Sequence, residues 1–535
     1  MVSRFLAMGI GIVQGVFVVR LLSTTDYGLV GIVTAVGSVT GIILHLGLVS
    51  GATREIAAVG ERSPKEEGPA LETSGLGSKT TPEPGPKSRA LRNSGEVLKI
   101  FISALLARMA VALPVFLILF FGAHLIAAGI YKHPEIAVAV RLYALILLLQ
   151  APQGIFNAVL SGLKKFKLVF IFQVVIALVS LALFVPSIYY LGFYGYFWAM
   201  LALAAVHTTV LFFLASRCFS GLWLSTSGQG NSKFEAPNSK QIQNSNFQNS
   251  KRFGHLNFGH WNLFRISDFG FRISTTEIVA NLHKIFSVGL AIYLVKIIFT
   301  LWERFGPLVL GRVASAAEVG VFAFALFYST KLMTASDAIT DVSLPVFSER
   351  FADGLAKFRS TFLSNFEKIY AFITLAAASA VFWSPELVYL IVGHKYDEAL
   401  LLIPFLVLAF WAYSFVNIIK SSLMVPAKLN RDMIVSYVLL FLGTVLGFFG
   451  LRSFGLLQAM VRAMAMGGIL ALVWQWVSVR RTLGLDIFGW KSIVLVVSLL
   501  PLIIIYSLSL GFLAKVGIFL ANLAIFLYLL EHLGI

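Results

Sequence analysis

Long apolar runs, separated by shorter polar stretches, follow one another along most of the chain. A helix needs about 20 mostly apolar residues to cross the hydrocarbon of a membrane. Fourteen runs approach or exceed this length, and we expect each to be a transmembrane helix: 4–22, 28–50, 97–122, 136–160, 168–189, 193–216, 285–303, 319–345, 362–383, 398–425, 433–450, 454–478, 488–510 and 512–531. The pattern therefore predicts an all-α, polytopic membrane protein.

The first run begins almost at once, with no charged leader and no small-residue cleavage site, so we interpret it as a retained helix and not as a signal peptide. Composition agrees with a membrane protein, because 58% of the residues are hydrophobic and only 13% are charged, against about a quarter in soluble domains. The single cysteine, Cys218, excludes an intrachain disulfide and a cysteine metal cluster. We expect no cofactor.

Basic residues are distributed unevenly between the connections, and cytoplasmic connections are the ones enriched in Lys and Arg. Those after even-numbered runs carry most of them: Arg54, Arg62, Lys65, Lys79, Lys87, Arg89, Arg92, Lys164, Lys165, Lys167, Arg350, Lys357, Arg359, Lys428, Arg431, Arg480, Arg481 and Lys491. Those after odd-numbered runs carry few, mainly Arg20, Lys132, Arg304, Arg312, Lys395 and Arg452. We therefore expect both termini in the cytoplasm. The net charge of +17 follows from this bias and implies no nucleic-acid partner.

Two connections differ from the others in composition. Residues 61–95 are rich in Pro, Gly, Ser and charge, and residues 225–275 contain the polar tract "NSKQIQNSNFQNSK". Neither has enough apolar residues to fold alone. They are either docking segments for a cytoplasmic partner or insertions that the fold tolerates, and the small entropic penalty of longer surface loops favours the second interpretation.

Several short motifs occur twice in the chain. "RLLSTTDYG" (20–28) corresponds to "RVASAAEVG" (312–320), and "KKFK" (164–167) to "KLNR" (428–431), after the fourth and tenth runs. "YGYFWAM" (194–200) and "FGLLQAM" (454–460) begin the sixth and twelfth runs. We expect two six-helix lobes in one orientation, related by a pseudo-twofold axis along the membrane normal, as in transporters with alternating access. We expect four units along the chain. They are the first lobe (1–218), a cytoplasmic connection (219–284), the second lobe (285–480) and helices thirteen and fourteen (481–535).

The first pair of motifs has a local structural explanation. Ser23 with Asp26, and Ser315 with Glu318, have the spacing of a capping box directly before an apolar run. Arg20 and Arg312 lie at the predicted outer ends of the preceding helices. They are either anchors at the membrane surface or ligands for a phosphate group.

The motif "VVRLLSTTDYGLVGIVTAVGSV" (18–39), with "LGLVSGATREIA" (46–57), resembles the polysaccharide biosynthesis, or O-antigen translocase, family. Segments 319–349 and 393–411 are similar to its second lobe. The family holds flippases of lipid-linked oligosaccharides and belongs to the superfamily that includes multidrug and toxin extrusion pumps. The resemblance implies fourteen helices in a V-shaped pair of lobes in a bacterial or archaeal cytoplasmic membrane. It also implies that undecaprenyl-diphosphate-linked glycan (an O-antigen, capsule or exopolysaccharide unit) moves to the outer leaflet. Glycan polymerases or glycosyltransferases are possible partners beside the membrane lipids.

A flippase of this kind needs cations for the diphosphate, and the fork of donors on Arg matches phosphate oxygens. The candidates for diphosphate binding are Arg20, Arg54, Lys296, Arg304, Arg312 and Lys331. Because a charge at mid-membrane costs at least about 2.5 kcal/mol, cations within helices are not expected to face lipid. The carboxylates Glu303, Asp337 and Asp341 are candidates for ion coupling, and the alternative is that these charges pair with one another inside the bundle.

A polar stripe on the fourth run has two possible roles. Gln150, Gln153 and Asn157 could bind sugar hydroxyls or make interhelical hydrogen bonds. The weaker candidates are Arg108, Arg141, Lys420 and Arg462, and we expect His45 and His207 to pack inside the bundle.

Two other functions are alternatives to a flippase: a membrane enzyme of glycan synthesis and a multidrug exporter. A membrane glycosyltransferase or polymerase would be equally apolar, but the outward connections here are short and neither a phosphate-binding Gly-rich motif nor His-Glu-x-x-His is present. An ion-coupled multidrug exporter of the same superfamily is the main alternative. An exporter of cationic drugs should have an acidic cleft, whereas the predicted cleft is cationic.

Overall fold

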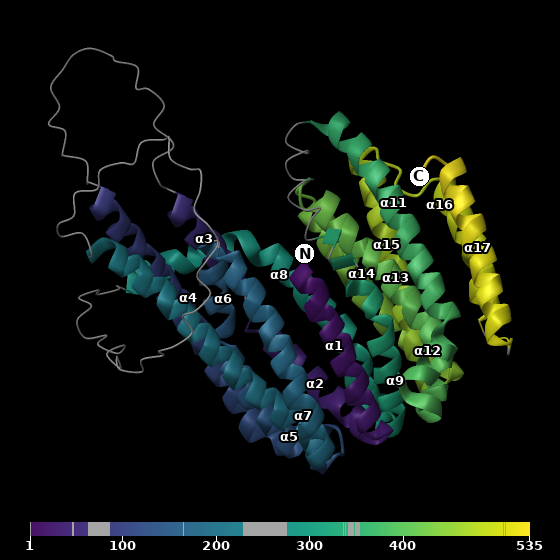
Figure 1. The fold of residues 1–535 in the computed structure, drawn as a ribbon, viewed down its shortest axis with the longest axis horizontal. Coiled ribbons are helices and arrows are strands. Elements are labelled where there is room, and N and C mark those ends of the chain that lie inside the picture. Colours follow the sequence, from purple (N-terminus) through teal and green to yellow (C-terminus); the bar gives the residue numbers. More distant parts are fainter. Residues whose placement is uncertain are drawn as a thin grey trace, which may run out of the picture.

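The computed structural model describes residues 2–44, 48–61, 86–163, 165–227, 275–334, 336–337, 339–340, 347, 354–506, 508 and 510–535, and all regular structure in these ranges is helical (Figure 1). Asp341, His45 and most of the two predicted insertions lie outside the described residues. Each of the fourteen predicted runs overlaps at least one helix.

Helices of the N-terminal half are α1 Val2–Leu21, α2 Thr24–Ile42, α3 Leu48–Glu61, α4 Pro86–His124, η1 Leu125–Ile130, η2 Pro134–Ile136, α5 Ala137–Gln150, α6 Gln153–Gly162 and α7 Phe166–Ser227. The predicted run 28–50 is therefore two helices and not one. The run 136–160 is also divided, at Pro152. Proline has no N–H to continue the hydrogen-bond ladder and disfavours a helical residue before it, so α5 ends at Gln150.

Helices of the C-terminal half are α8 Thr275–Val313, α9 Ala316–Ser329, α11 Leu355–Phe382, α12 Ser384–Val392, η4 Gly393–Leu401, α13 Ile403–Ile419, η5 Lys420–Met424, α14 Asn430–Gly450, η6 Arg452–Phe454, α15 Leu456–Leu483, α16 Trp490–Ile505 and α17 Phe512–His532. Arg304 was expected in an outward connection, but α8 continues to Val313 and contains it. The run 319–345 was expected to be one helix. Helix α9 ends at Ser329, and after a turn at Thr330 the described residues 331–334, 336–337 and 339–340 are helical again, so Ala316–Thr334 counts as one candidate span.

Helix α7 is a hairpin of two apolar arms. Gly192 interrupts it with φ 56° and ψ −132°, a conformation that residues with a Cβ rarely adopt. The rings of Phe184 and Tyr196 lie 5.2 Å apart, although twelve residues of straight helix would separate them by about 18 Å. The chain therefore folds back at Gly192, and the two arms correspond to the predicted runs 168–189 and 193–216.

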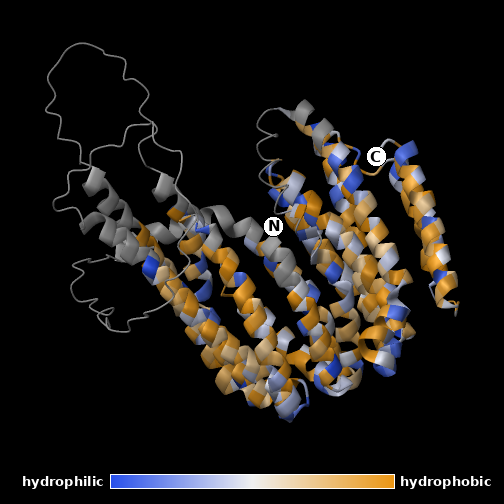
Figure 2. Cartoon of the chain, in the orientation of Figure 1, coloured by the Kyte–Doolittle hydropathy of each residue, from blue (hydrophilic) through white to orange (hydrophobic). Residues whose placement is uncertain are grey.

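The protein is a multi-pass integral membrane protein. Within the described ranges, nine helices are long and apolar enough to cross a membrane, and a tenth is counted if Phe362–Phe382 and Ser384–Leu401, bent by 60°, form one span. Figure 2 shows hydrophobic residues along most of the length of the helices and hydrophilic residues gathered mainly near helix ends.

The helices form two groups arranged as a V. In Figure 1, α3–α7 lie on the left and α11–α17 on the right, with α1, α2, α8 and α9 between them. The groups are separated at the top of the view and approach each other at the bottom, where α2 and α9 begin. The N- and C-termini both lie on the upper side of α1 and α17.

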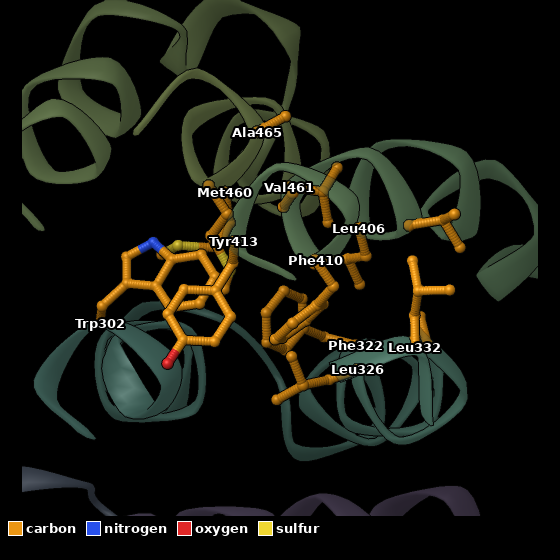
Figure 3. Close-up of a cluster of buried hydrophobic side chains, with 14 of the residues drawn as sticks. Trp302, Phe322, Leu326, Leu332, Leu406, Phe410, Tyr413, Met460, Val461 and Ala465 are labelled. Atoms are coloured by element: carbon orange, nitrogen blue, oxygen red, sulfur yellow. The ribbon is translucent and has the colours of Figure 1, made fainter. Parts of the chain in front are cut away.

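Helix α8 joins the two groups through different faces. Trp302 is fully buried, stacks on Tyr413 of α13 with a centroid separation of 5.4 Å, and donates from Nε1 to Thr444 Oγ1 of α14 at 3.0 Å. Figure 3 shows the surrounding apolar core, which α8, α9, α13 and α15 build together from Phe322, Leu326, Leu406, Phe410, Met460 and Val461. This face fixes α8 to the C-terminal helices.

The two repeated motifs form the N-terminal caps of α2 and α9, as predicted. Ser23 Oγ accepts from the backbone N–H of Asp26 at 3.0 Å. The second motif is a complete capping box, because Ser315 Oγ accepts from the Glu318 N–H at 3.2 Å and the Ser315 N–H donates to Glu318 Oε2 at 2.8 Å. Local helix capping thus explains these four polar residues.

The same motifs also bring the two halves of the chain into contact. A Cβ on Gly28 would collide with the carbonyl oxygen of Ala316, and a Cβ on Gly320 would collide with that of Thr24. The two glycines permit α2 and α9 to touch backbone to backbone at their N-terminal ends.

Candidate functional site

Between α2, α4, α5, α6 and α8 lies a cavity of about 420 Å³. Its walls include six of the predicted site residues, Gln150, Gln153, Asn157, Lys296, Glu303 and Arg304, and the weaker candidate Arg108. The six come from α5, α6 and α8, so the fold gathers side chains more than 130 positions apart. Arg108 of α4, with Ser38, Tyr143 and Thr300, completes the polar part of the lining.

Arg108 is the most deeply buried cation of this cavity, with 5% of its surface exposed. Its Nε and Nη1 atoms have no hydrogen-bond partner within the described residues. It lies 11 residues after Val97, within the apolar segment Val97–Ile130, which is long and apolar enough to cross a membrane. An unpartnered buried charge is costly, so the site is suited to an anion that supplies the missing acceptors.

Gly154 of α6 makes room for this guanidinium. A Cβ at position 154 would collide with Nη1 of Arg108 and lie 3.0 Å from its Cζ. The break between α5 and α6 at Pro152 places Gly154 in the first turn of α6. The position of Arg108 thus depends on a glycine in another helix.

Three charged residues of α8 form the opposite wall of the cavity. Arg304 Nε lies 3.7 Å from Glu303 Oε2, too far for a hydrogen bond but within ion-pair distance. Lys296 makes no ion pair within the described residues and does not pair with Glu303, although both were expected on one face. The cavity therefore holds three cations, including Arg108, and one carboxylate.

The three residues of the polar stripe are used differently. Gln153 is buried, and its amide donates to the Ala204 carbonyl at 3.2 Å and to Thr208 Oγ1 at 2.9 Å, both in α7. This side chain serves interhelical packing. Gln150 and Asn157 are half-buried on the cavity wall and offer amide groups to a polar ligand.

The other predicted residues lie elsewhere. Arg20 and Arg312 are exposed in the last turns of α1 and α8. Lys331, expected in the same cleft as Lys296, lies outside the cavity lining, with Nζ 4.0 Å from the centre of the Phe327 ring. The side chain of Arg54 and all of Asp341 lie outside the described residues.

A polar chain connects Asp337 with α13 and η5. Asn417 Nδ2 donates to Asp337 Oδ1 at 2.8 Å, and Lys420 Nζ donates to Asn417 Oδ1 at 2.6 Å. Lys420 begins a π-helical turn, a feature frequent at functional sites. Asn417 therefore connects the carboxylate of Asp337 with the ammonium group of Lys420 through two hydrogen bonds.

The remaining weaker candidates pack against aromatic rings. Arg141 lies over Phe120 at 6.0 Å, and Arg462 lies over Phe454 at 4.5 Å. His207 contacts Phe172 with a centroid separation of 4.9 Å, as expected for a packed histidine. The sequence indicated Arg108 only as a weaker candidate and did not indicate Tyr143, although both line the cavity. The available signal was an arginine in the middle of an apolar run.

Comparison with known families identifies the kind of protein to which this fold and cavity belong. The polysaccharide biosynthesis protein family matches residues 1–351 of the chain. The chain belongs to this family. No curated protein matches the chain.

Solved structures share the fold at low sequence identity. The lipid II flippase MurJ, in an inward closed conformation, is similar with a TM-score of 0.65 and 12% identity over 100% of both chains. An inward-facing multidrug resistance MATE transporter gives a TM-score of 0.61 with 14% identity, and an outward-facing one gives 0.50 with 16% identity. Both matches cover 90% of this chain and 94% of the other. At these identities the similarity concerns the fold.

Proposed function

We propose that this polysaccharide biosynthesis protein is a flippase that moves undecaprenyl-diphosphate-linked oligosaccharide from the inner to the outer leaflet of the cytoplasmic membrane. The observation that carries the proposal is Arg108, whose buried Nε and Nη1 have no hydrogen-bond partner among the residues that the structure describes. A diphosphate has the charge and the acceptors that such a group lacks. A cavity of about 420 Å³ also lies within the ~300–1,000 Å³ range of small-ligand sites.

In this proposal the head group lies between α4 and α8. Arg108, Lys296 and Arg304 neutralise the diphosphate, while the amides of Gln150 and Asn157 bind sugar hydroxyls. Gln153 holds α6 against α7 through Thr208 and so supports this wall. Arg54 makes a first contact at the cytoplasmic end, and Arg20 and Arg312 either anchor helices or release the head group at the outer end.

We propose fourteen crossings in two lobes, residues 1–218 and 285–480, with 481–535 as an appended pair of helices. Support comes from the reciprocal contact of the repeated motifs, in which Gly28 meets Ala316 and Gly320 meets Thr24. Each of these residues is 292 positions from its counterpart, as a pseudo-twofold axis between α2 and α9 requires.

Transport would proceed by alternating access of these lobes. The basic connections give cytoplasmic termini, so the side where the helix groups separate is the cytoplasmic one. Asp337 and Asp341 are proposed to couple transport to an ion, and cytoplasmic glycosyltransferases or polymerases are proposed partners of the connections.

A reconstitution experiment tests the proposed cargo. Purified protein in liposomes should make undecaprenyl-diphosphate-linked oligosaccharide accessible to an external glycan-modifying enzyme faster than protein-free liposomes do. The ion-coupled multidrug exporter is the competing function, and the same liposomes can be loaded with a cationic dye. Dye transport without movement of the lipid-linked glycan would overturn the proposal.

A further inference from the structure

A residue of the C-terminal half of the chain contacts the end of α1, in the N-terminal half. Lys395, in η4, extends its ammonium group to the end of α1, where Nζ donates to the carbonyl oxygen of Val19 at 3.1 Å and also to that of Leu22. These contacts join residues 376 and 373 positions apart in the sequence.

This contact has a clear electrostatic basis. The last four carbonyls of a helix have no intrahelical partner, and the C-terminal end of a helix favours a cation. Val19 and Leu22 flank the final turn of α1, Val2–Leu21. Lys395 thus faces two partly negative carbonyl groups at the end of α1.

The next residue reinforces the same junction. Tyr396 is fully buried and lies between Tyr27 of α2, at 6.3 Å and 80°, and Phe324 of α9, at 4.5 Å and 29°. Gly393, with φ +64°, turns the chain from α12 into η4. Consecutive side chains of one short turn therefore contact the opposite lobe.

We infer that Lys395 is a gating residue that holds the outer side of the transporter closed by capping α1. The inference rests on the proposed alternating access, because the lobes must part here before the cavity can open outward. The cap is broken in the outward-open state, and its loss favours that state. Lys395 is outside the lining of the cargo cavity and therefore acts on conformation and not on binding.

Thiol accessibility in the full-length chain tests this inference without any cargo. The only cysteine is removed with Cys218→Ser, and Ser38→Cys places a reporter in the cavity lining. A membrane-impermeant maleimide is then applied to right-side-out and to inside-out membrane vesicles. In Lys395→Gln we expect labelling from the outer side to rise about tenfold and labelling from the inner side to fall. Loss of a hydrogen bond from a charged group shifts a two-state equilibrium by about this factor.

Two matched variants separate the cap from general effects of charge. Lys395→Arg keeps a cation and should stay closed. Lys132→Gln removes an exposed lysine from the turn between η1 and η2 and should leave both labelling rates unchanged. The inference is overturned if Lys395→Gln labels like Lys132→Gln, or if labelling rises equally from both sides, as partial unfolding would cause. Since no glycan is involved, a failure of the proposed cargo would leave this result intact.

Discussion

Buried or half-buried cations occur on both sides of α8, and the protein satisfies them differently. On the side of the C-terminal helices, Lys420 bonds to Asn417, which bonds to Asp337, and Arg462 lies over aromatic rings. On the side of the N-terminal helices, Arg108 leaves two nitrogen atoms without partners in the described residues. Arg462 also has a buried Nε without a hydrogen-bond partner in the described residues, but two aromatic rings cover its guanidinium. No ring contact is found for Arg108 in the part of the chain that the structure describes, so we expect a ligand to supply its acceptors.

The strongest test of this comparison is Arg108→Met, which removes the charge and keeps a long side chain. We expect transport of the lipid-linked glycan in liposomes to fall about 10- to 100-fold, the value of a lost hydrogen bond between charged groups. The apparent unfolding temperature in detergent should rise, because an uncompensated buried charge is removed.

A matched arginine from the other region is the control for this variant. Arg462→Met removes the same charge where the guanidinium lies 5.1 Å from the Phe405 ring and 4.5 Å from the Phe454 ring. We expect it to lower the unfolding temperature and to leave most transport intact. If both variants lose stability and neither loses transport, the distinction between the two groups of cations is wrong.

Asp337→Asn should have the next largest effect, and of a different kind. The variant keeps a carbonyl oxygen that can accept from Asn417. It removes the negative charge that Asn417 connects to Lys420. If Asp337 couples transport to an ion, transport driven by a gradient should fall about tenfold, the order of a typical coupling free energy, while affinity for the glycan stays the same. Flux with and without an imposed proton or sodium gradient, together with a binding isotherm, measures both. Weaker binding at unchanged gradient dependence would instead make Asp337 part of the cargo route.

Much of this arrangement could be predicted from the sequence because membrane helices follow local rules. The length of the apolar runs predicted fourteen helical segments, and each run overlaps at least one helix. The Ser-x-x-Glu spacing predicted the N-terminal cap of α9. Intramembrane polar residues also indicated Lys296 and Glu303, which the cavity brings together.

The relative importance of the candidates depended on tertiary contacts. An arginine in an apolar run could equally reach the membrane surface, and only packing against Gly154 shows that Arg108 stays inside. Lys331 was grouped with Lys296 because both are cations within predicted helices, but they lie on different helices and Lys331 is outside the cavity lining. The contact of Lys395 with α1 joins segments more than 370 positions apart, and no local sequence pattern predicts it.

Gly154→Ala sharpens the comparison on the cavity side. The added Cβ would collide with the guanidinium of Arg108 and displace it, so we expect transport to fall about fivefold, as overpacking costs on the order of 1 kcal/mol. Gly122→Ala is the control, because a Cβ there meets nothing within 4 Å. The effect of Gly154→Ala should shrink in the Arg108→Met background, where the added Cβ still meets Cγ2 of Val49 but no guanidinium, since a double-mutant cycle reveals residues that act through one another. Additive losses would mean that Gly154 serves helix packing alone.

Lys331→Gln should have the smallest effect and tests whether cations on the other side of α8 contribute at all. Its ammonium lies 4.0 Å from the centre of the Phe327 ring, a contact worth about 0.5–1 kcal/mol when partly exposed. A Cβ on Gly15 of α1 would collide with that same ring, so Phe327 packs closely against α1. We therefore expect a small loss of stability and less than about a twofold change in transport, because the cation–π contact supports packing and not the head group. A thermal-shift series beside the liposome assay measures both quantities. If Lys331→Gln reduces transport as much as Arg108→Met at equal protein level, the diphosphate also contacts α9 and its neighbours, and the cavity beside α4 is one of two binding positions on the route.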